Sequence, residues 1–451
     1  MNRNEIVLIL LISFVIFVTN VNFNNKIQQY FFSNESIRCS DCNVILITAD
    51  ALRADHLTPY GYQKNTTPFL NDLSKESWLF LNATSQSGTT EESISSFFTS
   101  KFPHTDDVMN LRTSDKTLTE ILREKGYYTK AIVSVPHAKS IFGFSKGFEN
   151  FDDNFDLFRN ASEMTSLAVS WLRNNHEKPF FLWLHYKEPH SPYNPPKSYF
   201  QAFYEPFVGG IEYHNYTLYG EEINTSNEMI HNLSIAYDGN IRFLDDNLRI
   251  LFEYLNNSEL LNNTLVIITA DHGESLGEHF IFDHNNLYFG IIHVPLILKY
   301  PNLKSRIINK PVSLVDILPT ILDTLHIEFN STIRGKSLFL NRSDEELQFA
   351  EYIDYYTIIV DRWKLMRGHC EKDYCPYERT SGDYEKLFNI KIDPKETNDL
   401  KTNNSYIYEK MRNKLDKLLN TSLSLSEIKS NISIIPNEET KKALKELGYV
   451  K

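Results

Sequence analysis

Two strand-like segments of the chain end in the same way, and both endings carry groups that can bind a metal ion. The segment ILITAD ends at Asp50, and VIITADHGE brings Asp271 and His272 to the end of a second apolar run. Ligands bind at the carboxyl ends of parallel strands, so we expect these side chains to share one edge of a sheet. Two carboxylates and an imidazole suit a divalent cation. A lone Asp at a strand end more often caps a turn, and the adjacent His-Gly pair shifts the balance toward metal binding.

A segment rich in hydroxyl groups, SQSGTTEESISSFFTSKFPHT (residues 85–105), lies between these two strands and contains two adjacent glutamates. Its residues alone leave two interpretations open. Either one hydroxyl attacks a substrate, or the segment is a polar loop that leads into an apolar helix. The choice depends on what the rest of the chain places beside it.

The elements that must position these groups alternate between strand and helix. Strand signals lie at NVILITAD, YTKAIVSV, PFFLWLHY and NTLVIITAD, and helical segments such as TLTEILREKG and SLAVSWLRNN separate them. This alternation predicts an α/β fold with a doubly wound, mainly parallel sheet over residues 43–344. The runs FAEYIDYYTIIVD, WKLMRG and EKLFNI then predict short antiparallel strands. We therefore expect a smaller C-terminal α+β subdomain over residues 345–451, closed by a helix at NEETKKALKELG.

Length and composition bound the class of protein. A chain of 451 residues with 41% hydrophobic residues can bury a large core and fits one large domain plus a smaller one. The net charge is −12, and no block of Lys and Arg forms a basic stripe. Nucleic acid is therefore not an expected partner.

The N-terminal segment indicates export. An apolar run from Ile6 to Val18 follows Arg3 and suits a signal peptide over residues 1–23, with a linker over 24–42. No small-residue cleavage site follows, so an uncleaved membrane anchor stays open beside a removed signal. In both cases we expect an extracellular protein or one held on the outer face of the membrane.

Sequons and cysteines point to the same compartment. The four cysteines form two local couples, Cys39 with Cys42 and Cys370 with Cys375. Disulfides within or between the couples rank above a zinc site, because the couples are far apart in the chain. Weaker support for a secreted glycoprotein comes from the Asn-x-Ser/Thr sequons, for example at Asn65, Asn82, Asn160, Asn224, Asn262 and Asn420.

From Asn43 to its C-terminus, the chain resembles the sulfatase family of the alkaline phosphatase superfamily. The similarity is carried by the segments NVILITADALRADHLTPYGY, TTPFLNDLSKES, TSKFPHT, FFLWLHYKEPHSPYNPP, LVIITADHGESLGEH, HVPLILKYP, VSLVDILPTILD, RGKSL, KLFNIKIDPKETNDL and ALKELGYV. Together these segments are highly specific, although each alone is not. The resemblance implies the family's α/β fold and a metal-dependent hydrolase or transferase acting on sulfate or phosphate esters.

The resemblance also assigns the hydroxyl-rich segment. The family's nucleophile motif reads Cys or Ser, any residue, Pro, Ser, Arg, and then Thr-Gly-Arg five residues on. Laid on this chain without gaps, it places Thr90 at the nucleophile position and Ser93 at the serine. The departures are Glu92 for Pro, Ile94 for Arg, Ser100 for Gly and Lys101 for the last Arg.

Thr90 changes the expected chemistry. Without Cys or Ser at this position, the chain cannot form the formylglycine whose second hydroxyl expels sulfate in sulfatases. A Thr hydroxyl is better matched to phosphorus, because an activated water or an acceptor alcohol can clear a phospho-enzyme. Thr at this place resembles phosphodiesterases and the lipoteichoic acid synthase or phosphoethanolamine transferase branch.

Carried over residue by residue, the metal ligands are Asp50, Thr90, Asp271 and His272. The family usually adds a second acidic or polar ligand directly after the first, and this position is Ala51 here. The substitution disfavours an oxygen-rich calcium site and favours a single Mn, Zn or Mg ion.

The resemblance also implies groups that contact the substrate. His190 in KEPHSPY and His284 in FDHNNLY are expected to stabilise the transferred group or to protonate the leaving oxygen. Lys101 is a candidate for anion binding, with a solvated surface position as the alternative. His185 and His279 rank lower, as packing residues or supports for the ligands. The segment Ser134 to His137 does not reproduce the family's Gly-Lys-Trp-His, so the Lys of that segment is missing.

Three functions follow in order of preference. The first is a phosphoester hydrolase or transferase with Thr90 as nucleophile, for which a glycan or a lipid-linked group is the candidate substrate. The second is a sulfatase in the strict sense. The third is an inactive surface protein that binds a glycan or another partner, suggested by the anionic Glu91 and Glu92 beside Thr90. The retained Asp50, Asp271 and His272 argue against this third function.

Overall fold

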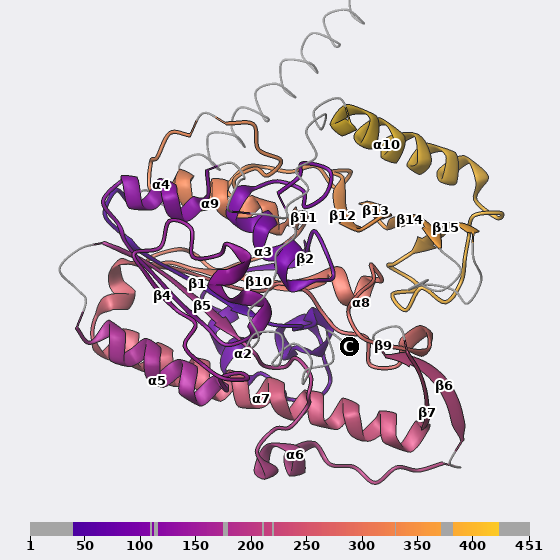
Figure 1. Ribbon diagram of the computed structural model, residues 1–451, viewed down its shortest axis with the longest axis horizontal. Helices are drawn as coiled ribbons and strands as arrows, with labels where there is room; N and C mark the ends of the chain where they lie inside the picture. Colours follow the sequence, from indigo (N-terminus) through magenta and orange to yellow (C-terminus); the bar gives the residue numbers. More distant parts are fainter. Residues whose placement is uncertain are drawn as a thin grey trace, which may run out of the picture.

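The computed structural model describes residues 39–108, 111, 116–174, 179–209, 212–218, 221–329, 331–370 and 382–423. Its centre is an eight-stranded sheet with helices on both faces, and a separate four-stranded sheet lies beside it (Figure 1). The predicted α/β architecture with a small C-terminal subdomain is therefore confirmed.

The large sheet has the strand order β11-β2-β10-β8-β1-β5-β3-β4. Its strands are β1 (Asn43–Ala49), β2 (Trp78–Thr84), β3 (Tyr128–Val133), β4 (Asn150–Asp152), β5 (Phe180–Tyr186), β8 (Thr264–Ala270), β10 (His293–Lys299) and β11 (Arg306–Ser313). Neighbouring strands run parallel except at β10, which is antiparallel to both β8 and β2. All residues of β1, β5 and β8 are buried, as expected for central strands covered on both faces.

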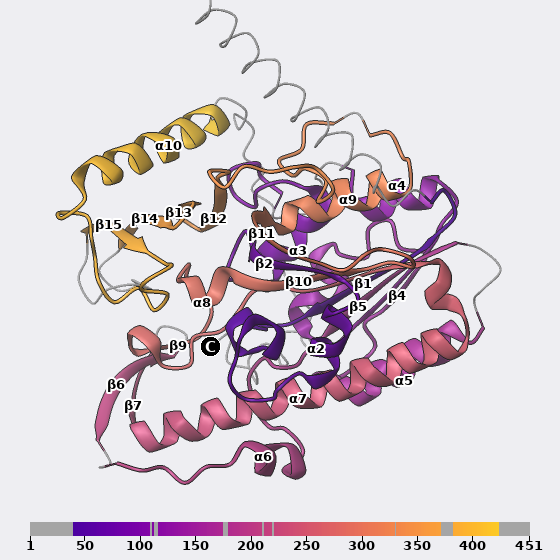
Figure 2. The ribbon, with the colours of Figure 1, turned by 180° about the vertical axis from the view of Figure 1, so that it is seen from behind.

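Helices cover the two faces of this sheet, as Figures 1 and 2 show. One face carries α2 (Pro68–Ser74), α5 (Ala161–Leu172) and α7 (Asn227–Asn257), with α6 (Lys197–Phe203) on the outer side of α7, and the other carries α3 (Thr90–Thr99), α4 (Leu118–Glu124) and α9 (Ile317–Thr324). Helix α7 begins where the Ser226 hydroxyl accepts a hydrogen bond from the Met229 amide, at 3.2 Å. Its buried Ile241, Leu244 and Leu248 recur every three or four residues, which is the spacing of one helix face.

The smaller sheet is antiparallel throughout, in the order β12-β13-β14-β15. Its strands are β12 (Gln348–Tyr352), β13 (Tyr355–Val360), β14 (Trp363–Cys370) and β15 (Gly382–Asn389), with α10 (Ser405–Leu423) packed against β13 and β14. The run FAEYIDYYTIIVD thus forms two strands joined at Ile353, which has a φ of 52°. The helix expected at residues 437–448 lies outside the described residues.

A third, three-stranded sheet forms beyond the end of α7 in a region that sequence patterns did not resolve. Strands β6 (Tyr213–Leu218) and β7 (Glu221–Ser226) form a hairpin, and β6 also pairs in parallel with β9 (Ile281–Phe282). Between this sheet and the small sheet, α8 (Phe289–Ile292) leads into β10.

The structure describes only some of the residues on which the prediction of export depends. Cys39 and Cys42 form a disulfide, which confirms one pairing within a couple, and Cys375 lies outside the described residues. Over the described part of the chain, no helix is both long and apolar enough to cross a membrane. The predicted signal or anchor, residues 1–23, falls outside that part. The six sequon asparagines named above have exposed side chains.

Candidate functional site

The two predicted aspartates lie side by side at the ends of neighbouring strands. β1 and β8 pair in parallel with Ala49 opposite Ala270, so Asp50 and Asp271 follow at the same edge. Both carboxylates are buried. Asp271 Oδ1 accepts hydrogen bonds from the backbone amides of Ala51 (3.2 Å) and His272 (2.8 Å), which fixes the orientation of its other oxygen.

His272 completes the predicted group. Its Nδ1 lies 2.8 Å from the Gly273 carbonyl oxygen, to which it must donate, so Nε2 carries the lone pair. That Nε2 is 3.6 Å from Asp50 Oδ1 and 3.6 Å from Asp271 Oδ2. The structure therefore brings together Asp50, Asp271 and His272 as the sequence predicted.

A second imidazole, His185, reaches the same cluster from β5. Its Nε2 lies 3.8 Å from Asp50 Oδ2 and 3.9 Å from Asp271 Oδ2. One donor atom from each of Asp50, His185 and Asp271 falls within 4.8 Å of the others, a spacing that ligands of one metal ion show. Sequence analysis ranked His185 as a packing or supporting residue.

The electrostatics of the cluster favour a bound cation. Burial and the neighbouring Asp271 raise the pKa of Asp50 well above its usual value, and burial raises the pKa of Asp271 to about 6. Burial lowers the pKa of His272 to about 4 and also lowers the pKa of His185. Two buried carboxylates with neutral imidazoles are unfavourable by themselves. A divalent cation would remove this cost, so the donor set fits such an ion.

Thr90 stands at the first position of α3, next to the cluster. Its Oγ1 is buried and 3.2 Å from His272 Nε2, to which the hydroxyl can donate. Ser93 fixes the helix against the sheet because its hydroxyl donates to the Asp271 carbonyl at 2.6 Å. Gly88 permits a close approach before the helix, since a Cβ there would lie 2.2 Å from the His284 carbonyl oxygen. The hydroxyl-rich segment is thus a turn that aims one hydroxyl at the cluster.

The two glutamates after Thr90 are both engaged by histidines. Glu91 contacts His137 Nδ1, and this partner, against the opposing effect of burial, lowers the pKa of Glu91. Glu92 accepts from His104 Nε2 at 2.9 Å and from the Ser87 hydroxyl. Neither carboxylate is therefore an uncompensated negative charge at the site.

His190 and His284 face each other beside His272. Their Nε2 atoms are 3.2 Å apart, and the rings of His284 and His272 stack with centroids 4.3 Å apart. His190 Nδ1 lies 2.7 Å from the Ser191 carbonyl oxygen, and His284 Nδ1 lies 2.7 Å from that of Gly88. Burial lowers the pKa of both, and their mutual proximity lowers that of His190 further.

Other candidates do not join the cluster. Lys101 lies past the far end of the ten-residue α3, roughly 15 Å along the helix from Thr90, and its charged neighbours are Asp106 and Arg334. Ile94, in place of the family's Arg, is buried in the hydrophobic core. His279 stacks on Tyr288 with centroids 3.7 Å apart.

At this edge, the sequence ranked His185 only as a packing or supporting residue and did not single out His137. His185 sits in a strand whose other inward residues are apolar, and its parallel pairing with Thr48 was the signal that could have placed it near Asp50. His137 follows β3, the neighbour of β5 in the sheet. It lies close enough for its charge to lower the pKa of Asp50, against the dominant effect of burial.

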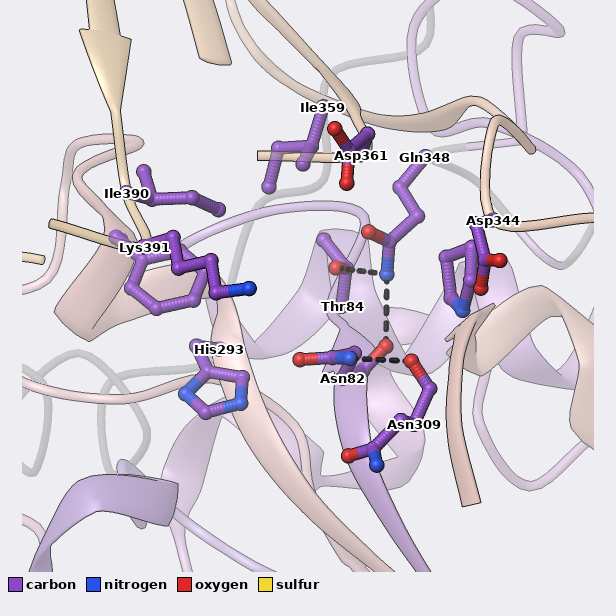
Figure 3. A pocket seen from close by; sticks show the side chains of 12 residues that line it. Asn82, Thr84, His293, Asn309, Asp344, Gln348, Ile359, Asp361, Ile390 and Lys391 are labelled. Atoms are coloured by element: carbon purple, nitrogen blue, oxygen red, sulfur yellow. Dashed lines mark hydrogen bonds between the residues drawn. The ribbon is translucent and has the colours of Figure 1, made fainter. Parts of the chain in front are cut away.

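A cavity of about 270 Å³ between the large and small sheets is separate from this cluster (Figure 3). Asn82, His293, Asp361 and Lys391 are among the side chains that line it, and none of the predicted site residues is. Asn82 Nδ2 donates to the Asn309 carbonyl at 2.5 Å, so its amide is already engaged within the fold.

Comparison with known proteins identifies related sequences over most of the chain. A sequence model of the sulfatase family matches residues 42–327, and a model described as N-sulphoglucosamine sulphohydrolase, C-terminal, matches residues 277–422. Arylsulfatase K of Mus musculus is 26% identical over 447 residues, covering 84% of this chain and 79% of the relative. An arylsulfatase of Clostridium perfringens is 24% identical, covering 81% and 91%.

Solved structures share the fold. The phosphonate monoester hydrolase of Agrobacterium radiobacter superposes with a TM-score of 0.69 at 19% identity, covering 84% of this chain and 96% of that one. A protein determined with its substrate D-glucosamine-2-N,6-O-disulfate gives a TM-score of 0.71 at 19% identity, covering 86% and 99%.

Proposed function

Because this chain belongs to the sulfatase family and is an ester hydrolase, we propose that it cleaves phosphoesters with Thr90 as the nucleophile. The observation that carries the proposal is the placement of the Thr90 hydroxyl, 3.2 Å from His272 Nε2 at the edge of the Asp50–Asp271 cluster. The nucleophile position holds neither Cys nor Ser, the precursors of formylglycine.

Asp50, Asp271 and His272 would hold a divalent cation. Bound there, the ion would lower the pKa of the Thr90 hydroxyl and neutralise charge on the transferred group. The remaining roles belong to the chain itself, which orients the hydroxyl, buries the site and handles protons.

The covalent step is an in-line substitution at phosphorus. The Thr90 hydroxyl gives up its proton to solvent and the bond from Thr90 Oγ1 to phosphorus forms, while the bond from phosphorus to the leaving oxygen breaks and the leaving oxygen takes up a proton. Water or an acceptor alcohol then attacks phosphorus, gives up its own proton, and releases Thr90, whose oxygen is protonated again. A sulfated Thr has no internal exit comparable to collapse of a formylglycine hydrate, and this difference favours phosphorus.

His190 and His284 are suited to the proton transfer. Each has its Nδ1 directed at a backbone carbonyl, which leaves both Nε2 atoms facing each other at 3.2 Å. A proton held between them makes one ring cationic, which burial disfavours in the free protein; an anionic substrate would favour its uptake, and the proton can then pass to the leaving oxygen. Lys187 holds the loop in place, because its Nζ donates to the His190 carbonyl at 2.7 Å and to that of Pro192 at 3.1 Å.

The pairing of Glu91 and Glu92 weakens the hypothesis of an inactive binding protein. That hypothesis depended on anionic side chains repelling an anionic substrate. His137 and His104 engage these carboxylates instead. Sulfate esters stay as the alternative substrates, since relatives of this chain are named arylsulfatases.

Paired assays on one protein preparation test the proposal. An aryl phosphate, an aryl phosphodiester and an aryl sulfate are offered with added Zn²⁺, Mn²⁺, Mg²⁺ or Ca²⁺, and Thr90→Ala is compared with wild type. We expect metal-dependent phosphoester turnover that falls by about 10³-fold or more in the variant.

Thr89→Ala is the matched control, because it removes the adjacent hydroxyl, which does not cap α3. Its turnover should stay near that of wild type. Preferential release of sulfate, or phosphoester turnover that survives in Thr90→Ala, would overturn the proposal.

A further inference from the structure

Ala51 directly follows Asp50 at the strand-end cluster and contributes no side-chain ligand. Its backbone is fixed by two hydrogen bonds: the amide donates to Asp271 Oδ1 at 3.2 Å, and the carbonyl accepts from the Tyr237 hydroxyl at 2.7 Å. The methyl side chain offers no donor atom. Another part of the chain must supply a donor atom if the ion is to have a further ligand.

The sheet register brings His185 to this edge. In β5, the neighbour of β1, His185 pairs with Thr48, and in β8 Thr269 pairs with the same residue. Side chains of paired residues in parallel strands lie on the same face, and so do residues two apart. His185 therefore lies on the face of the sheet that carries Asp50 and Asp271.

The hydrogen bonds around His185 prepare Nε2 to bind a cation. Nδ1 lies 2.7 Å from Thr48 Oγ1, which also accepts from Trp183 Nε1 at 3.0 Å and can donate to the Leu184 carbonyl at 3.4 Å. When the Thr48 hydroxyl donates to the Leu184 carbonyl, Nδ1 donates to Thr48 and the lone pair lies on Nε2. A histidine that binds a metal commonly donates its other ring N–H in this way.

Three buried acceptor atoms then converge. Within the described part of the chain, Asp50 Oδ1, Asp271 Oδ2 and His185 Nε2 have no hydrogen-bond partner. The distances from Nε2 to Asp50 Oδ2 (3.8 Å) and to Asp271 Oδ2 (3.9 Å) are too long for hydrogen bonds. A purely structural role explains the bond from His185 to Thr48 but leaves all three acceptors unsatisfied, at a substantial energetic cost.

We propose that His185 is a further ligand of the same ion and that the resulting set of two imidazoles and two carboxylates selects Zn²⁺ over Ca²⁺. Calcium prefers six to eight oxygen ligands, whereas imidazole nitrogens favour zinc and similar transition metals. The inference rests on the proposed function for the presence of a metal at this site, and it adds a ligand and a metal preference.

Metal binding without substrate tests it. Zn²⁺ and Ca²⁺ affinities of chelator-treated protein are measured by competition with an indicator, and X-ray absorption counts the imidazoles around bound Zn²⁺. We expect two imidazoles in wild type and one in His185→Ala, with the Zn²⁺ affinity of the variant lower by about 10-fold or more. The double variant Ala51→Asp/His185→Ala should bind Ca²⁺ more tightly than His185→Ala does. Asp suits this position because Ala51 has a φ of 59°, a region that Asp adopts more readily than Ala.

His293→Ala is the matched control, since His293 bonds the Leu81 carbonyl away from the cluster. Its Zn²⁺ affinity should equal that of wild type. One imidazole around Zn²⁺ in wild-type protein would overturn the inference, even if His185→Ala fails to fold. A folded His185→Ala with unchanged Zn²⁺ affinity would also overturn it. Phosphoester turnover that survives Thr90→Ala would instead overturn the proposed nucleophile and leave these ligand counts standing.

Discussion

Two buried aspartates of the large domain have opposite surroundings. Asp238, on α7, accepts from His56 Nδ1 at 2.9 Å, from the Tyr62 hydroxyl at 2.9 Å and from Lys64 Nζ at 3.0 Å. Asp271, at the end of β8, has one oxygen held by backbone amides and the other 3.6 Å or more from its nearest imidazoles.

The difference separates a structural group from a site prepared for a ligand. Asp238 ties the segment 56–64 to α7, and its partners offset the cost of burying its charge. Among the described residues, no lysine or arginine forms an ion pair with Asp50 or Asp271, so this carboxylate pair concentrates negative charge. Such an arrangement persists in a fold when a bound ion completes it.

The same substitution should therefore have opposite effects in the two clusters. In metal-free protein, Asp238→Asn removes the charge that Lys64 and His56 contact, and we expect the free energy of unfolding to fall by about 3 kcal/mol. Asp271→Asn removes one of two repelling carboxylates, and we expect an increase of about 1 kcal/mol. Urea unfolding after chelation measures both.

With added Zn²⁺, the wild-type protein should become more stable than Asp271→Asn, which is the reverse of the order expected without metal. Wild-type protein gains stability by binding the ion, whereas Asp271→Asn loses a ligand and gains little. If Asp271→Asn destabilises the metal-free protein as much as Asp238→Asn does, the contrast between the two clusters is mistaken.

A smaller effect sharpens the role of Glu92. Burial disfavours protonated His104, but the hydrogen bond and charge of Glu92 outweigh it and raise the pKa of His104. Protonated His104 is thus favoured in the folded state. Its contribution is full below the unfolded pKa, near 6.5, and is lost as pH rises through the higher folded pKa.

We expect the free energy of unfolding to fall by about 1 kcal/mol across this window in wild type. Glu92→Gln should flatten the profile, as measured by urea unfolding between pH 6 and pH 9. An identical pH profile in both proteins would show that Glu92 does not hold His104 in this way.

Much of the fold followed from local patterns. The apolar runs at β1, β5 and β8 are buried throughout, and such runs signal central parallel strands. The apolar pattern could not predict that β10 is antiparallel to its neighbours, because such a pattern looks the same for parallel and antiparallel strands. The hairpin of β6 and β7 was also missed, since its strands show no clear apolar alternation.

The sequence could predict those candidate ligands that directly follow the end of a strand. Asp50, Asp271 and His272 share that position, and the structure places them together. His185 lies inside a strand, so only the register between β1 and β5 reveals that it faces Asp50. Lys101 is the opposite of His185: its position in the motif predicted a role at the site, but the structure places it away from the cluster.

The most direct test of the account is to identify the covalent intermediate. Protein turning over an aryl phosphate monoester is quenched with acid, digested and mapped by mass spectrometry. The account predicts phosphate on Thr90. This modification should appear only with added metal and should be missing in Thr90→Ala. Phosphate on another residue, or rapid phosphoester turnover that never labels Thr90, would contradict it.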